Sequence, residues 1–395
     1  MIKKYKPRCS KELRELVKDD SICLGDIDTS LITDMSWLFC DSKRTNFDGL
    51  ETWDTSNVTT MERLFHRVKH FNHPIGNWNV SSVTNMECIF CGCSDFNQPL
   101  EDWDVSSVTN MESMFGTCGK FNQPLNDWDI SNVRNISCMF CEAESFNQPL
   151  NKWDTSEVRE MAWTFAGCTK FNQNIGSWNT SNVFRMEGMF EGAVRFNQPL
   201  NDWDVSNVRY MLRMFDGAKS FNQPLDRWNV SRVEDAERMF KNARSFNQPL
   251  NDWDVSNVQD MREMFSEASN FNQPLNGWNV SNVQNMYCMF NEAKSFNQPL
   301  DKWDISNVKD MAYMFCEATS FRQPITAWRL CGQSTKGMFL RLPDYRDMES
   351  RVMCLTPLNE EAMKYDLEDM IKIFGEKAVK DALQLYGAKY GLKEY

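Results

Sequence analysis

The chain has 395 residues and a formal net charge of −12 at pH 7. This acidic balance argues against non-specific binding to nucleic acid or to an anionic membrane, because both carry negative charge. No apolar run approaches the roughly 20 residues needed to cross a bilayer. The start, MIKKYKPRCSKELRELVKDD, also lacks the apolar core of a secretory signal peptide. We therefore expect no nucleic-acid partner, no membrane insertion and an intracellular, cytoplasmic setting.

The first predicted element is a short helix over residues 10–19, with the sequence SKELRELVKD. We expect residues 1–23 to form an N-terminal helical cap. An atypical first coil, built on Leu24, Ile27, Met35 and Phe39, follows it.

A fixed repeat occupies most of the chain. The phrase FNQPLNDWDVSNV occurs at 196–208 and again at 246–258, and twelve tryptophans stand 25 residues apart. A period of this length predicts a solenoid, in which each repeat buries its apolar face only against its neighbours. We expect a curved leucine-rich-repeat-like solenoid of about thirteen coils over residues 24–331. Its core ladder would be Trp53, Trp78, Trp103, Trp128, Trp153, Trp178, Trp203, Trp228, Trp253, Trp278, Trp303 and Trp328.

Each repeat predicts a strand, a helix and a turn, which places the fold in the α/β solenoid class. The strand is indicated by the alternation of Trp and Val, and the helix by apolar residues three or four apart. Ser is expected as the N-cap of that helix, and Pro in the following turn removes an unpaired donor. In one repeat these residues are Leu100, Trp103 and Val105, then Ser106, Val108, Met111, Met114, Phe115 and Cys118, then Phe121 to Pro124. Stacked coils would give a parallel sheet on one face and a row of helices on the other.

The tryptophan ladder suggests a stacking platform for a ligand, but its place beside Leu and Val favours a core role. The Asn after each Phe, such as Asn97, Asn122 and Asn147, is predicted to form a buried hydrogen-bonded ladder.

The pattern L-x-x-W-x-V-S-x-V-x-x-M-x-x-M-F-x-x-A-x-x-F resembles the BspA-like branch of the leucine-rich repeats over about residues 5–330. The 25-residue form of this repeat occurs in mycoplasma surface proteins, other bacteria, protists and large DNA viruses. The resemblance implies a solenoid used for protein contacts, in adhesion or as an assembly part, and it implies no catalytic residues. Without a signal peptide, an intracellular or virion setting is favoured over a bacterial surface.

After Trp328 the pattern decays, and two helices are predicted from Asn359 onward. The Gly after each helical stretch is a plausible stop. We expect residues 332–395 to form a degenerate coil and a helical C-terminal cap. A separate docking module is the alternative.

Residues just before and after each Trp are expected to point outward, and many are acidic. A row of like charges on neighbouring coils should be destabilising, so either a basic partner uses it or the side-chain oxygen bonds local backbone. Asn replaces Asp at the same register, as at Asn79 and Asn179, which favours the backbone role for individual residues. The net acidic face remains the predicted partner-binding surface, with Asp102, Asp104, Asp127, Asp129, Asp154, Asp202, Asp204, Asp252 and Asp254.

The three histidines, His66, His70 and His73, lie within one repeat, and Cys91 shares the register of His66 in the next. This spacing is compatible with a metal, but the positions are variable, so we expect a solvated face and no metal or other cofactor. The cysteines do not form a paired framework, and free thiols are expected.

These features predict a non-enzymatic interaction or scaffold protein that binds a protein with a basic surface through the acidic sheet face. No small-molecule substrate or catalytic residue is expected, since a regular stripe offers no concave polar pocket. The alternatives are a surface adhesin of the same fold and a virion component of a large DNA virus.

Overall fold

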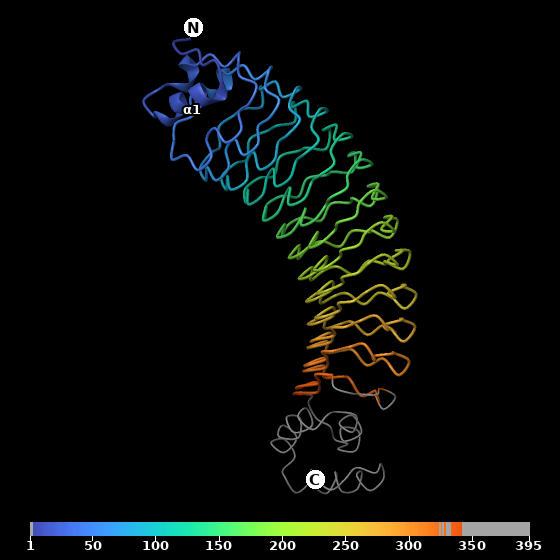
Figure 1. Cartoon of the computed structure of the whole chain (residues 1–395). Helices are drawn as coiled ribbons and strands as arrows, with labels where there is room; N and C mark the ends of the chain where they lie inside the picture. Colours follow the sequence, from blue (N-terminus) through green and yellow to red (C-terminus); the bar gives the residue numbers. More distant parts are fainter. Residues whose placement is uncertain (1–2, 324, 326–327, 329–332, 342–395) are drawn as a thin grey trace, which may run out of the picture. The chain divides into compact units, whose positions relative to one another are not determined.

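The computed structural model describes residues 3–323, 325, 328 and 333–341. The helices predicted from Asn359 onward lie outside the described residues. The chain divides into two compact units, Met1–Asn207 and Val208–Tyr395, here called unit 1 and unit 2. The described helices are α1 (Ser10–Lys18) and two short 3₁₀ turns, η1 (Leu24–Asp26) and η2 (Leu50–Thr52) (Figure 1).

Helix α1 begins unit 1, as the sequence predicts (Figure 1). Leu13 and Val17 lie four residues apart on one face of the helix and are both buried. The Ser10 hydroxyl donates to the carbonyl oxygen of Asp34, and the Arg14 guanidinium donates to that of Ser36 at 2.5 Å. These bonds fix α1 to the first coil.

Successive repeats form successive loops of chain that stack along each unit (Figure 1). The segment around each tryptophan, such as residues 100–108, does not form the predicted parallel sheet. Within one coil, the Trp103 amide donates to the Leu100 carbonyl at 3.1 Å and the Val108 amide to the Val105 carbonyl at 2.9 Å, so this segment is a series of turns. Parallel bridges between coils lie further along, where Asn110 pairs with Asn85 and with Asn135.

The predicted helix in each coil is wrong. Among the described residues the repeats contain no helix beyond η2. Ser113 and Thr117 have left-handed φ values of 54° and 58°, which an α-helix excludes. The amides of Met111 and Ser113 donate to the next coil, to Asn135 at 3.0 Å and Ser137 at 2.8 Å. This segment is therefore a ladder of short turns joined sideways from coil to coil.

The core of each unit is built from aromatic ladders. In unit 1 the rings of Phe115 and Phe140 stack with centroids 5.7 Å apart, and in unit 2 those of Phe265 and Phe290 stack at 5.6 Å. All twelve tryptophans of the 25-residue ladder are 2–5% exposed. Stacked aromatic rings of this size bury large apolar areas, so they account for the main packing between coils.

Asn side chains form a second ladder along the turns. The backbone N–H of Asn122 donates to the side-chain Oδ1 of Asn97 at 2.9 Å. The backbone N–H of Asn147 donates in the same way to Oδ1 of Asn122 at 2.9 Å. The predicted hydrogen-bonded ladder therefore exists. It is not buried, however, because these three residues are half-exposed.

Candidate functional site

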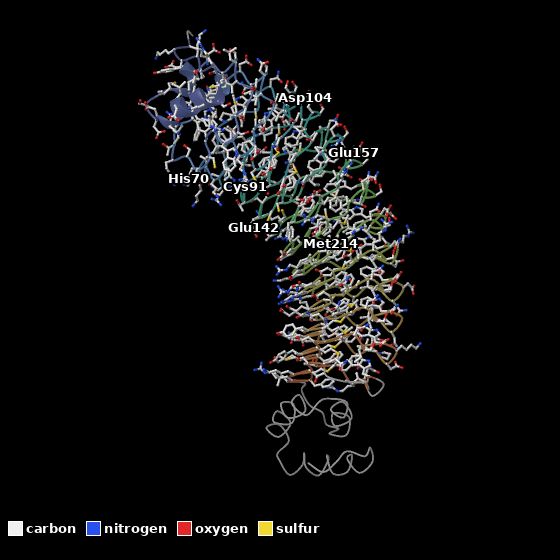
Figure 2. All side chains as sticks on the ribbon, in the orientation of Figure 1. His70, Cys91, Asp104, Glu142, Glu157 and Met214 are labelled. Carbon is white, nitrogen blue, oxygen red and sulfur yellow. The ribbon has the colours of Figure 1, made fainter. Side chains whose placement is uncertain are left out.

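The acidic residues predicted to bind a partner are all exposed in the structure. We call those of unit 1 the Trp-side acidic surface: Asp102, Asp104, Asp127, Asp129, Asp154, Asp202 and Asp204. In unit 2, Asp252 and Asp254 are exposed at the same registers. Figure 2 shows Asp104 on one side of unit 1 and Glu142 on the other. This surface flanks the buried tryptophans, whose segments form turns and not strands. The prediction that these residues lie on the face of a sheet is therefore wrong.

The Asp after each Trp closes a local turn. Asp129 Oδ1 accepts a hydrogen bond from the Ser131 amide at 3.0 Å, and hydrogen bonds from the Ser131 side chain and backbone hold the pKa of Asp129 below its ordinary value. In the next coil but one, Asn179 Oδ1 accepts from the Ser181 amide at 3.1 Å in the same way. The turn therefore requires one oxygen acceptor and no charge.

The Ser of each repeat is not the N-cap of a helix, as the sequence suggested. The Ser106 amide and hydroxyl both donate to Asp104 Oδ1, at 3.1 and 2.6 Å. No helix follows this serine, and both of its hydrogen bonds stabilise the turn that begins at the Asp.

A hollow of about 350 Å³ opens on this surface in unit 1, and Glu101, Asp102 and Asp127 contribute its carboxylates. Its rim carries one basic contact, in which Lys152 Nζ lies 2.6 Å from Asp127 Oδ1. Both partners of that ion pair are well exposed, so it contributes little to stability. The hollow accordingly offers a negatively charged recess of a size that admits a long basic side chain.

A second acidic hollow, of about 500 Å³, lies in unit 2 and includes Tyr210, Asp235, Asp260 and Asp310. Burial, followed by the charges of Asp260 and Glu237, raises the pKa of Asp235. These acids were not among the predicted site residues, although Asp235, Asp260 and Asp310 share one register of the repeat. Asn285 occupies the same register.

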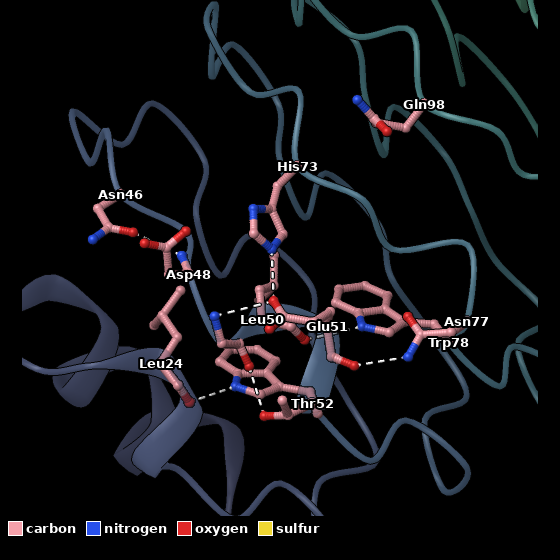
Figure 3. A network of polar contacts seen from close by, with 12 residues as sticks. Leu24, Asn46, Asp48, Leu50, Glu51, Thr52, His73, Asn77, Trp78 and Gln98 are labelled. Atoms are coloured by element: carbon pink, nitrogen blue, oxygen red, sulfur yellow. Dashed lines mark hydrogen bonds and ion pairs between the residues drawn. The ribbon is translucent and has the colours of Figure 1, made fainter.

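The histidines do not form one group. His70 Nδ1 lies 2.7 Å from Asp95 Oδ2, and His73 Nε2 lies 2.7 Å from Glu51 Oε2 (Figure 3). The Glu51 backbone carbonyl also accepts from Asn77 Nδ2 at 2.8 Å. These two histidines therefore act as polar links between neighbouring coils.

His66 meets two cysteines instead. The ligand atoms of His66, Cys88 and Cys91 all lie within 4.8 Å of one another. Burial, with the nearby Arg67 and Arg63, lowers the pKa of His66 and keeps its imidazole neutral. The register of the repeat predicts that His66 and Cys91 lie on neighbouring coils, but it does not identify Cys88. The signal that identifies it is the C-x-x-C spacing of Cys88 and Cys91.

The described cysteines are free. The buried thiols of Cys93, Cys118 and Cys168 each donate to a backbone carbonyl 28 residues earlier, on Phe65, Phe90 and Phe140. They fill the register that Ala143 and Ala193 occupy elsewhere. Burial raises the pKa of all three thiols, which makes them poor nucleophiles.

The described part of the chain has no helix of the length and apolarity that a membrane span requires. A family model described as "Mycoplasma protein of unknown function, DUF285" matches residues 14–102, 33–152, 66–174, 135–253 and 246–347. The chain belongs to this family. The overlapping matches to the DUF285 family model reflect its repeats, since neighbouring windows cover the same coils.

No curated protein matches this DUF285 chain. A solved structure described as "Crystal structure of TLR13-ssRNA13 complex" aligns with 7% identity, over 76% of this chain and 53% of that chain, with a TM-score of 0.21. The aligned region thus spans about half of that structure, and a score this low supports no argument about function.

Proposed function

We propose that this DUF285 protein is a non-enzymatic scaffold that binds a protein with a basic surface through the Trp-side acidic surface. One observation carries the proposal: the fold needs an oxygen acceptor after each Trp, and Asn supplies it at Asn79 and Asn179 without charge. The carboxylates at Asp104, Asp129 and Asp204 are therefore more negative than the fold requires. Surplus exposed charge of one sign favours a partner of the opposite sign.

The hollow between Asp102 and Asp127 supports the same partner chemistry. Lys152 offsets the charge of Asp127, and like charges on the remaining carboxylates, Glu101 and Asp102, repel. A Lys or Arg from a partner, placed in this recess, would relieve that repulsion and form charge-assisted hydrogen bonds. The chemistry that fits is a basic protein or peptide segment.

The test uses variants that keep the turns. Asp104→Asn, Asp129→Asn and Asp204→Asn together remove three charges, while Oδ1 still accepts from the Ser two residues later. The matched control is Glu142→Gln, Glu144→Gln and Glu191→Gln, which also removes three negative charges from unit 1 but away from the tryptophans. Both variants change the net charge by the same amount, so only the position of the charge differs.

Binding of a fluorescently labelled Lys- and Arg-rich peptide is measured by anisotropy between about 0.05 and 0.5 M salt, where exposed charges become screened. We expect the Asn variant to weaken binding about tenfold at low salt and the Gln variant to leave it near wild type. Wild type, the Asn variant and the Gln variant are also used to recover the native partner from source material. The Asn variant should recover less of it than the other two proteins. Equal losses in both variants would contradict the proposed surface.

We also propose the finer assignments that the sequence suggests. These are membership of the BspA-like branch and an intracellular setting, the latter supported by the free thiols of the described cysteines. A surface adhesin and a virion component are the alternatives. Thiol counting on protein from its native source discriminates the settings, because an oxidising environment would convert exposed thiols such as Cys9 and Cys23.

A further inference from the structure

Two repeats carry the same C-x-x-C turn. Cys88 to Cys91 and Cys138 to Cys141 occupy one register two repeats apart. In each turn the amide of the second cysteine donates to the carbonyl of the first, at 3.1 and 3.0 Å. The backbone of the first cysteine is in the left-handed region in both turns, with φ values of 54° at Cys88 and 55° at Cys138. The two turns thus present their thiols on equivalent backbones.

The preceding coil distinguishes the two turns. His66 lies one repeat before Cys91, whereas Gly116 lies one repeat before Cys141. The first turn therefore faces an imidazole, and the second faces no side chain at that register. Cys138 and Cys141 form an internal control that has the thiols and lacks the histidine.

His66 has an unexplained polar atom. Its Nδ1 is buried and has no hydrogen-bond partner. One ring nitrogen of the same imidazole lies within 4.8 Å of the sulfurs of Cys88 and Cys91. A buried polar atom without a partner costs free energy. Such an atom in a folded protein calls for an explanation, and a bound ion is one.

We propose that His66, Cys88 and Cys91 bind a zinc ion that links two neighbouring coils of unit 1. One imidazole and two thiolates are ligands that Zn²⁺ accepts in tetrahedral sites. Two thiolates also balance the 2+ charge of the ion. Three protein ligands leave the fourth position for water.

The geometry requires only a small contraction. Zn–S distances of about 2.3 Å and Zn–N distances of about 2.0–2.1 Å place tetrahedral ligand atoms roughly 3.5–3.8 Å apart. Side-chain rotation brings atoms that already lie within 4.8 Å to that separation. The guanidinium groups of Arg67 and Arg63 lie near the site, and Arg63 is paired elsewhere. The Arg63 guanidinium is held by Glu87 at 3.1 Å and lies over the Trp37 ring at 4.5 Å.

The other thiols of this region are not candidates for the site. Cys93 and Cys118 donate to the carbonyls of Phe65 and Phe90, both at 3.0 Å, and are fully buried. They stay protonated as core residues, whereas Cys91 is partly exposed.

The test titrates the reduced, chelator-treated full chain with Zn²⁺ against a chromophoric chelator, and with Co²⁺ as a spectroscopic probe of thiolate ligation. The variants use residues that occur at the same registers elsewhere: His66→Asn as at Asn291, Cys88→Ser as at Ser113, and Cys91→Ser as at Ser266. These replacements are therefore compatible with the coil, and thermal unfolding without metal checks that each variant folds. The control is Cys138→Ser with Cys141→Ser.

We expect wild type to bind one Zn²⁺ tightly, with a rise in its unfolding temperature and thiolate-to-Co²⁺ absorption. Each variant at the site should weaken affinity about 100-fold, and the control should match wild type within a factor of about two. Three results would overturn the proposal: His66→Asn binding as tightly as wild type, binding lost in the control, or no binding to reduced wild type. A Cys88–Cys91 disulfide found by mass spectrometry in protein that binds no metal when reduced would assign the turn to redox chemistry instead.

Discussion

The indole Nε1 of Trp178 donates a hydrogen bond to the carbonyl oxygen of Leu150, 28 residues earlier, at 2.9 Å. The same contact joins Trp128 to Leu100 at 3.0 Å, and in unit 2 it joins Trp278 to Leu250 at 2.8 Å. The tryptophan therefore does two things in each coil. It fills the core, and its indole adds a second hydrogen bond to a carbonyl that already accepts a backbone amide, as the Leu150 carbonyl does from Trp153 at 3.3 Å.

The first prediction separates these two roles at Trp178. Trp178→Ala should lower the free energy of unfolding by about 3–5 kcal/mol, because it opens a large cavity. Trp178→Phe keeps an aromatic ring but removes the indole donor, so the Leu150 carbonyl keeps only the Trp153 amide at 3.3 Å, and the change should cost about 0.5–1.5 kcal/mol. The adjacent control, Asn179→Asp, should change stability by less than about 0.5 kcal/mol. Urea unfolding followed by tryptophan fluorescence measures all three, and a Phe variant as stable as wild type would show that the indole bond is dispensable.

The buried ladder and the N-terminal helix could be read from the sequence for simple physical reasons. A 25-residue period with Trp and Phe at fixed places leaves each coil dependent on its neighbours for burial. Helix α1 combines apolar Leu13 and Val17 at a spacing of four with charged residues between them. In both cases the buried positions recur at one fixed spacing.

The predicted helix after Ser106 failed because turns imitate its spacing. Each turn, such as Met111 to Met114, has an amide bonded to the carbonyl three residues earlier, at 3.2 Å. Consecutive turns therefore bury a residue every three or four positions, as a helix does. The left-handed residues that decide against a helix, Ser113 and Thr117, are not glycines, so composition gave no warning.

The candidate sites were predicted unequally. The exposure of Asp104 and Asp129 follows from their place beside a buried Trp, since neighbours along an extended chain alternate in direction. The approach of Cys88 to His66 depends on how two coils stack and on a left-handed cysteine. Such tertiary detail is not encoded in spacing alone, although the C-x-x-C pair marks where to look.

The second prediction concerns the acceptor in the Asp turn. Asp129→Ala removes the oxygen that the Ser131 amide binds at 3.0 Å, and should cost about 1 kcal/mol. Asp129→Asn keeps that oxygen and should stay within about 0.5 kcal/mol of wild type. Chemical unfolding of both variants provides the comparison. If Asn is as destabilising as Ala, the negative charge itself supports the turn, and the surplus-charge argument for the acidic surface fails.

The third prediction is that the half-buried carboxylate of Asp235 in unit 2 costs stability. Burial and the charges of Asp260 and Glu237 raise the pKa of Asp235, so its ionised form is disfavoured in the fold. Asn285 shows that an amide suits the register, because its Oδ1 accepts from the Tyr287 amide at 3.0 Å. Asp235→Asn should therefore stabilise the protein by about 0.5–1 kcal/mol at pH 7. The gain should shrink as the pH falls through the raised pKa, where wild-type Asp235 becomes neutral. Exposed Asp254→Asn is the control, and a stabilisation independent of pH would contradict the stated cause.

The fourth prediction is the pH dependence carried by Glu263 in unit 2. Burial alone would raise its pKa, but hydrogen bonds and charges from Arg238 and Lys241 outweigh burial and lower the pKa below its ordinary value of 4.5. Arg238 Nη2 lies 2.6 Å from Glu263 Oε1, and Lys241 contacts the other oxygen. A carboxyl with a lowered folded pKa contributes stability above its unfolded pKa and loses it as the pH falls through the folded value. Glu263→Gln should therefore cost about 1–3 kcal/mol at pH 7.

That cost should diminish steadily below about pH 5, as wild-type Glu263 takes up a proton and comes to resemble the Gln variant. Urea unfolding of both proteins from pH 7 to about pH 3 measures the difference at each pH. Glu267→Gln serves as the control, because Glu267 lies in the same coil and carries the same side chain. If the Glu263→Gln penalty stays constant down to pH 3, the variant acts through packing, and the cluster of Arg238, Lys241 and Glu263 does not stabilise unit 2 through charge.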